Sequence, residues 1–188
     1  MKDIIILNGP PGCGKDAIAK RLIELMPTFA HHEVKHRLVE LAVCTSGLTY
    51  DGWHYLQQRE LKEKPTPVLG GLSPRGFLIH ISENFMKPLY GNRYFGDAAA
   101  ARVAASSAKT IVFSDGGFEE EVAALSQVGY VHLIHIHREG YTFSGDSRSY
   151  LAANAPYCST YLKVEQTEGE LDDAVHDIAL HMLEWCSK

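Results

Sequence analysis

Apolar residues along the chain alternate between short continuous runs and stretches with helical spacing. Residues 4–7 form an uninterrupted aliphatic run, which is typical of a strand that helices cover on both faces. Ile18 and Leu22 then recur at helical spacing, and Pro27 ends the predicted helix. The alternation continues to the last stretch, 171–185, and predicts an α/β fold of three layers around a mostly parallel sheet.

The same criteria predict the other elements of one domain that spans residues 1–188. Ser73 and Pro74 supply a cap and a proline at the first helical position, which marks a helix start. Gly47 and Gly129 are predicted to end two further helices. The remaining strands are predicted near 29–34, 110–114, 131–136 and 161–165, and the helices near 38–46, 74–85, 94–107 and 118–125.

Composition narrows the class of protein. The chain has 45% hydrophobic and 22% charged residues, which suits a soluble domain with a substantial core. No stretch is long and apolar enough for a membrane span or a signal peptide, so we expect a cytoplasmic protein without a membrane partner. The four cysteines contain no CxxC pair, which predicts reduced thiols rather than disulfides or a zinc site.

Charge is spread unevenly along the chain, whose net charge is −5. Residues 165–188 carry seven acids and one base, whereas residues 48–96 carry six bases and four acids. The net positive stretch can hold an anion, and we predict that 48–96 binds the acceptor of a reaction.

The strongest chemical signal lies between the first predicted strand and helix, where the sequence follows the P-loop pattern GxxxxGK[ST] except at its last position. Glycines there allow consecutive N–H groups to surround phosphate oxygens at a helix N-terminus. Lys15 adds a positive charge for the β- and γ-phosphates. The motif predicts that ATP binds to Gly9, Pro10, Pro11, Gly12, Cys13, Gly14, Lys15, Asp16 and Ala17.

Two aspartates are candidate Mg²⁺ ligands. Asp16 stands where a hydroxyl normally reaches the metal, although an acid in the first helical turn also suits the helix dipole alone. Asp115 ends the apolar run 111–114, the usual place of a carboxylate that holds Mg²⁺ or its waters, and it also suits a simple cap. The histidines lack a matching set of ligands, and we interpret them as structural.

The stretch 138–160 has no clear periodicity, and a loop of this length is more often functional than idle. In a phosphoryl-transfer enzyme it would be a lid that excludes water and brings arginines to the transferred group. Arg138 and Arg148 are the candidates, with two solvated surface arginines as the alternative.

These residues resemble the bacteriophage deoxynucleoside monophosphate kinases, within the P-loop nucleotide kinases. The matching segments are residues 14–16 (GKD), 72–75 (LSPR) and 112–121 (VFSDGGFEEE). The resemblance implies a nucleoside-monophosphate-kinase-like fold with a lid, and ATP- and Mg²⁺-dependent transfer of a γ-phosphoryl group to a deoxynucleoside monophosphate. It places Arg75 on the acceptor side and the two loop arginines near the lid. The candidate acceptor contacts are Arg75, Lys35, Arg59 and Arg93.

The sequence departs from that family after Asp115, where an arginine usually precedes the phenylalanine but Gly116 and Gly117 precede Phe118. A cation suited to an acceptor phosphate is missing there. Transfer to an alcohol instead benefits from a carboxylate that accepts the hydroxyl proton, a role open to Asp16 or Asp115. Similarity to phage kinases that act on 5-hydroxymethyl pyrimidines within DNA implies the alternative acceptor, which is the hydroxyl of 5-hydroxymethyluracil or another such base.

In that alternative the aromatic residues of 48–96 would stack an extruded base, although core packing is expected for more than half of them. A third class is a P-loop switch that binds nucleotide without a second substrate. The lid-like loop and the basic segment favour a second substrate. The predicted partner is a nucleotide acceptor, free or within hydroxymethylated DNA, and a homodimer is possible. A phage-encoded protein would act in the host cytoplasm.

Overall fold

The computed structural model describes residues 1–186, and the chain forms two compact units. The first unit comprises Met1–Val34 and the described residues from Gly96 onward. The second unit comprises Lys35–Phe95 and so contains residues 48–95 of the region predicted to bind the acceptor. In the described part, no helix combines the length and apolar character that a membrane span needs.

The first unit is built on a five-stranded sheet in the order β2-β3-β1-β4-β5, and every neighbouring pair is parallel. This arrangement confirms the parallel sheet predicted from the apolar runs. The strands β2 and β3 lie on one side of β1, and the later strands β4 and β5 lie on its other side. In such sheets ligands bind beyond the carboxyl ends of the strands where the order changes sides. The strands are β1 (Lys2–Asn8), β2 (Phe29–His32), β3 (Thr110–Phe113), β4 (Gly129–His137) and β5 (Thr160–Glu165).

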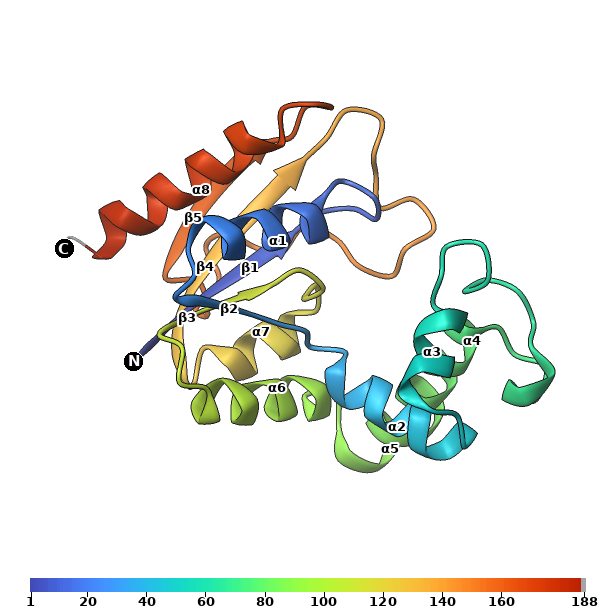
Figure 1. Ribbon diagram of the computed structural model, residues 1–188. Coiled ribbons are helices and arrows are strands. Elements are labelled where there is room, and N and C mark those ends of the chain that lie inside the picture. The colour runs from blue at the N-terminus through green and yellow to red at the C-terminus, as the bar shows by residue number, and fades with distance from the viewer. Residues whose placement is uncertain (187–188) are drawn as a thin grey trace. The chain divides into compact units, whose positions relative to one another are not determined.

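Helices cover both faces of the sheet (Figure 1). On one face, α1 (Lys15–Leu25) and α8 (Leu171–Cys186) enclose a core in which Ile5 and Leu7 pack against Ile18 and Ile178. On the other face lie α6 (Tyr94–Ala105) and α7 (Glu119–Leu125). All four aliphatic residues at 4–7 are fully buried, because β1 lies at the centre of the sheet between these layers. The three-layer α/β prediction is confirmed.

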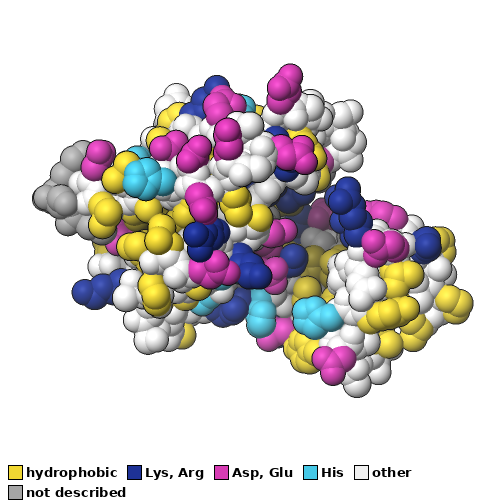
Figure 2. Space-filling view, turned by 45° about the horizontal axis from the view of Figure 1, so that its top comes forward, with side chains coloured by type: hydrophobic (Ala, Val, Ile, Leu, Met, Phe, Trp, Pro, Cys, Tyr) yellow, Lys and Arg dark blue, Asp and Glu magenta, His cyan; other side chains and the backbone are white. Residues whose placement is uncertain are grey.

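The second unit is helical. Ser73 Oγ accepts a hydrogen bond from Gly76 N at 3.0 Å, which confirms the predicted cap. Hydrophobic side chains are exposed on its surface among charged ones, as Figure 2 shows at the right of the view. Its elements are α2 (His36–Ser46), α3 (Tyr50–Leu56), a 3₁₀ turn (Pro67–Leu69), α4 (Pro74–Ile79), a π-helical segment (His80–Met86) and α5 (Lys87–Tyr90).

Two predicted boundaries differ from the structure. The helix expected over 74–85 widens into π-helix, where Lys87 N bonds to Ser82 O, directly before Pro88. Proline has no N–H and would collide with a carbonyl in regular α-helix, so the wider turn accommodates it. Gly129 does not end a helix, since α7 stops at Leu125 and Gly129 is the first residue of β4.

Candidate active site

The loop between β1 and α1 has the geometry of an anion cradle. Gly14 precedes α1 with φ 105°, a left-handed conformation that a side chain would strain. Its carbonyl accepts from Ile18 N at 2.9 Å, so the helix begins directly at the end of the loop. The first N–H groups of α1 therefore have no intrahelical partner and are available to an anion. These features fit the triphosphate that the motif predicts.

Lys15, the first residue of α1, folds back onto this loop. Its Nζ donates to Gly9 O at 2.7 Å and to Pro10 O at 2.8 Å. Burial lowers the pKa of Lys15 from its ordinary value, and the charge of Arg148 acts in the same direction. A bound phosphate would replace the two carbonyls as partner of the ammonium group.

Asp16 is tied to the carboxyl end of β3. Ser114 Oγ donates to Asp16 Oδ1 at 2.7 Å, and His31 Nε2 lies 3.0 Å from the same Oγ. Because the single hydrogen of Ser114 goes to the carboxylate, His31 is the donor and carries a hydrogen on Nε2. The hydroxyl that the motif lacks at position 16 is thus present beside it, on Ser114.

Asp115 follows β3 by two residues and is held by Val34, whose N–H donates to Asp115 Oδ1 at 2.9 Å. Carboxylate oxygens are the donors that Mg²⁺ prefers, and Mg²⁺ usually takes one or two of them together with nucleotide phosphates. Within residues 1–186 no cluster of three or more metal-ligating side chains forms. The carboxylates of Asp16 and Asp115 have the chemistry of Mg²⁺ ligands, and their role as ligands stays a prediction.

Arg148 belongs to the same surroundings. The carboxylate of Asp146, whose side chain is 4% exposed, accepts from Arg148 Nε at 2.9 Å and from Nη2 at 2.8 Å. These bonds raise the pKa of Arg148, and the carboxylates of Asp115 and Glu121 add to the effect. The side chain of Arg148 lies over Gly117, two residues after Asp115, since a Cβ at Gly117 would stand 2.6 Å from Arg148 Cδ.

Arg138 lies in different surroundings from Arg148. Its Nη2 is 3.2 Å from Glu168, and its guanidinium lies 4.7 Å above the ring centre of Tyr141. That ring covers the tip of the cradle, because a Cβ at Gly12 would stand 2.8 Å from it. The whole connection 138–159 contains neither helix nor strand, and Thr160 already belongs to β5.

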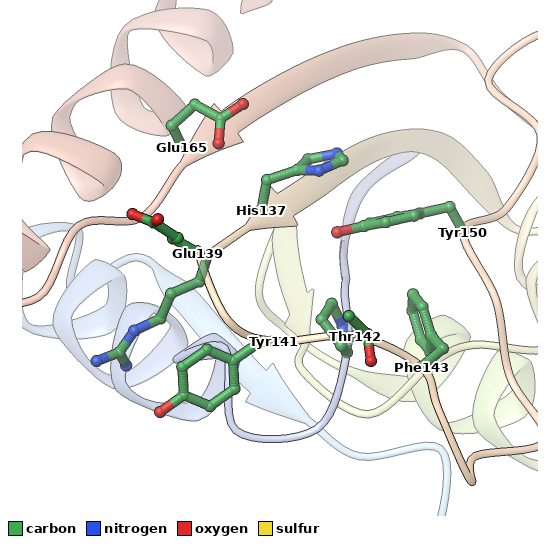
Figure 3. Close-up of a pocket in the computed structure, with 9 residues that line it drawn as sticks. His137, Glu139, Tyr141, Thr142, Phe143, Tyr150 and Glu165 are labelled. Carbon is green, nitrogen blue, oxygen red and sulfur yellow. The ribbon is translucent and has the colours of Figure 1, made fainter.

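A cavity of about 440 Å³ lies beside the cradle (Figure 3). Pro10 forms part of its wall, together with His137 and Glu165 from the carboxyl ends of β4 and β5. Tyr150 stacks on His137, with ring centres 4.4 Å apart and planes 15° from parallel. The cavity thus combines aromatic surfaces with charged groups, including Arg138.

The predicted acceptor contacts all lie in the second unit. Arg75 is in the first turn of α4, and its Nη1 is 3.3 Å from Glu63. Lys35 precedes α2, while Arg59 and Arg93 lie in the turns after α3 and before α6. Their role toward an acceptor stays a prediction.

Three residues of the site were not predicted from the sequence. Asn8 ends β1 and is 1% exposed, Asp146 holds Arg148, and Gln166 packs against Gly14 while 7% exposed. The available signal for Asn8 was a polar residue that interrupts an apolar strand immediately before the motif. Asp146 and Gln166 carry no comparable signal.

Known proteins resemble the chain in part of its sequence and in its fold. Residues 2–64 match the family model of magnesium chelatase, subunit ChlI. No curated protein matches the sequence. A kinase candidate from Chloroflexus aurantiacus has a similar structure, with a TM-score of 0.50, 13% identity and 97% of each chain covered.

Two other solved structures are similar over nearly the whole chain. A sugar kinase from Janibacter has a TM-score of 0.49 at 14% identity, covering 98% of this chain and 95% of that one. A shikimate kinase from Acinetobacter baumannii has 0.45 at 15% identity, covering 98% and 94%. The chain has the fold of the P-loop kinases. The parallel sheet order and the cradle after β1 are its structural basis.

Proposed function

We propose that the protein transfers the γ-phosphoryl group of ATP to a nucleotide acceptor, in the first place a deoxynucleoside monophosphate. The observation that carries this proposal is the hydrogen bond from Ser114 to Asp16, which joins the loop that holds Lys15 to the carboxyl end of β3. Asp115 follows Ser114 there, and the side chain of Arg148 lies over Gly117. A phosphate cradle with a lysine, an arginine and carboxylates for Mg²⁺ recurs among enzymes of phosphoryl transfer.

Each group has a distinct part in the proposed reaction. The amides at the start of α1 hold the phosphate tail, and Lys15 neutralises charge at the β- and γ-phosphates. Arg148 stabilises the charge that develops on the transferred group. Asp16 and Asp115 would hold Mg²⁺, which neutralises phosphate charge when bound.

The cavity beside Pro10 is the place that we assign to the nucleoside part of ATP. It adjoins the cradle, and aromatic rings such as Tyr150 and His137 offer flat surfaces to a base. Its volume of about 440 Å³ lies within the range of small-molecule sites.

The acceptor proposal gains support from the position of Arg148. The sequence lacks an arginine before Phe118, yet the side chain of Arg148 lies directly over Gly117. A positive charge suited to a phosphate is therefore present at this point. The argument for a hydroxyl acceptor in DNA rested on the absence of such a positive charge, so we retain the free nucleotide as the proposed acceptor.

Acceptor profiling with γ-³²P-labelled ATP tests the proposal. We expect label on one or more deoxynucleoside monophosphates, and a much slower transfer with the Lys15→Ala variant. Transfer only to hydroxymethylated DNA would contradict the free-nucleotide acceptor. ADP formation that no acceptor stimulates would contradict a second substrate altogether.

A further inference from the structure

Asn8 connects the start of the phosphate cradle to a distant part of the chain. Its Oδ1 accepts from Leu151 N at 2.9 Å, and its Nδ2 donates to Ser149 O at 3.3 Å. Both the oxygen and the nitrogen of the Asn8 amide are therefore hydrogen-bonded, which fixes the orientation of this side chain. The segment 149–151 is fastened to the last residue of β1, although more than 140 positions separate them in the sequence.

Tyr150, between these two contacts, fastens the same segment to β4. Its hydroxyl donates to Ile136 O at 2.9 Å, and its ring stacks on His137. Hydrogen bonds of this kind hold their geometry best where water does not compete, and Asn8 is 1% exposed. Residues 149–151 thus have contacts with two neighbouring strands of the sheet.

Arg148 directly precedes this fastened segment. Asp146 binds its backbone N–H at 2.9 Å as well as its guanidinium. Its side chain also fills the space over Gly117. Three contacts therefore limit where the Arg148 side chain can lie. They are the fastened segment 149–151, the carboxylate of Asp146 and the backbone at Gly117.

We propose that Asn8 is a positioning residue that sets the place of the Arg148 side chain over Gly117, beside the carboxyl end of β3. This inference rests on the proposed function. A stabilising charge is effective when it is already in place before the reaction, and a displacement of about 1 Å can cost on the order of 100-fold in rate. Asn8 acts here through Arg148, because it holds the segment that directly follows this arginine.

A double-mutant cycle with Asn8→Ala and Arg148→Ala tests the inference. We expect Asn8→Ala to lower kcat by about 10- to 100-fold and Arg148→Ala by about 1,000-fold, each with a smaller change in the KM for ATP. In the Arg148→Ala background, Asn8→Ala should have no further effect on kcat. Asn154→Ala, in the same loop but exposed, is the matched control and should resemble wild type.

A second variant guards against a folding defect in Asn8→Ala. Tyr150→Phe keeps the ring and removes only the bond to Ile136 O, and we expect a loss of a few fold in kcat that likewise vanishes without Arg148. Tyr130→Phe, on an exposed tyrosine at the opposite end of β4, is its control. Amide hydrogen exchange over 148–151, measured without nucleotide, should be faster in Asn8→Ala than in wild type.

The outcomes separate this inference from the proposed function. If the losses in kcat add fully in the double variants, the role of Asn8 is overturned. The same holds if Asn8→Ala leaves amide hydrogen exchange over 148–151 unchanged. Neither result contradicts the proposed kinase activity. A wild-type protein that transfers no phosphoryl group to any acceptor would overturn both.

Discussion

The side chain of Arg148 lies so close over Gly117 that a Cβ at Gly117 would stand 2.6 Å from Arg148 Cδ. Atoms of the two residues cannot approach that closely, so only glycine leaves room for the arginine in this position. The sequence has no arginine directly after β3, and Arg148, from the connection between β4 and β5, supplies the positive charge there.

Gly117→Ala should therefore impair catalysis by displacing Arg148. We expect kcat to fall by about 10- to 100-fold, with the thermal midpoint of unfolding nearly unchanged. Gly116→Ala is the matched control, because its Cβ would meet Ile6 at 3.5 Å, an ordinary contact. Steady-state kinetics of ADP release measures both. Equal activity in the two variants would mean that the position of Arg148 does not matter.

Asp16→Asn tests whether the carboxylate after Lys15 serves the metal. The amide oxygen can still accept from Ser114 Oγ, so the local hydrogen bond persists while the charge is lost. We expect the Mg²⁺ concentration for half-maximal activity to rise roughly 10-fold. Asp177→Asn, an exposed aspartate on α8, controls for net charge. An unaltered Mg²⁺ requirement would contradict a metal role and leave Asp16 its hydrogen bond with Ser114 and its interaction with the helix dipole.

Buried His132 makes the free energy of unfolding depend on pH. Burial lowers the pKa of His132 below its ordinary value, and this effect outweighs the opposing one of Asp3, 3.1 Å away. At a pH between the lowered pKa of His132 in the folded chain and its ordinary pKa in the unfolded chain, His132 binds a proton only when the chain is unfolded. Stability should therefore fall as pH drops below about 6.5, by up to about 1.4 kcal/mol per pH unit for this group.

Urea unfolding at several pH values between 5 and 8 measures this dependence. His132→Gln removes the titrating group, and we expect a shallower loss of stability toward pH 5 than in wild type. His135 contributes in the same direction, since burial lowers its pKa as well. An identical slope in the variant would show that His132 does not couple to folding.

The predictable part of this fold is local. A continuous apolar run predicts β1, helical spacing predicts α1 and α8, and Ser73 with Pro74 predicts the start of α4. Each of these signals depends on neighbours within a few positions. The π-helical segment before Pro88 was missed because its apolar residues keep the spacing of an ordinary α-helix.

The candidate site likewise has a part that local sequence predicts and a part that depends on tertiary contacts. Residues 9–17 are contiguous, so one motif predicts the whole cradle. The link from Asn8 to Ser149 and Leu151 joins positions that only the sheet brings together. Arg148 was predicted as part of a lid, but the surroundings that hold it, Asp146 and Gly117, depend on tertiary contacts that no local pattern encodes.

The most direct measurement is the acceptor-dependent turnover of Lys15→Ala beside Lys20→Ala, an exposed lysine on the same helix. Lys15→Ala removes the cation of the cradle and should lower kcat by about 100- to 1,000-fold in a protein that unfolds at the wild-type temperature, while Lys20→Ala retains wild-type turnover. A folded Lys15→Ala protein with undiminished turnover would contradict phosphoryl transfer at this loop.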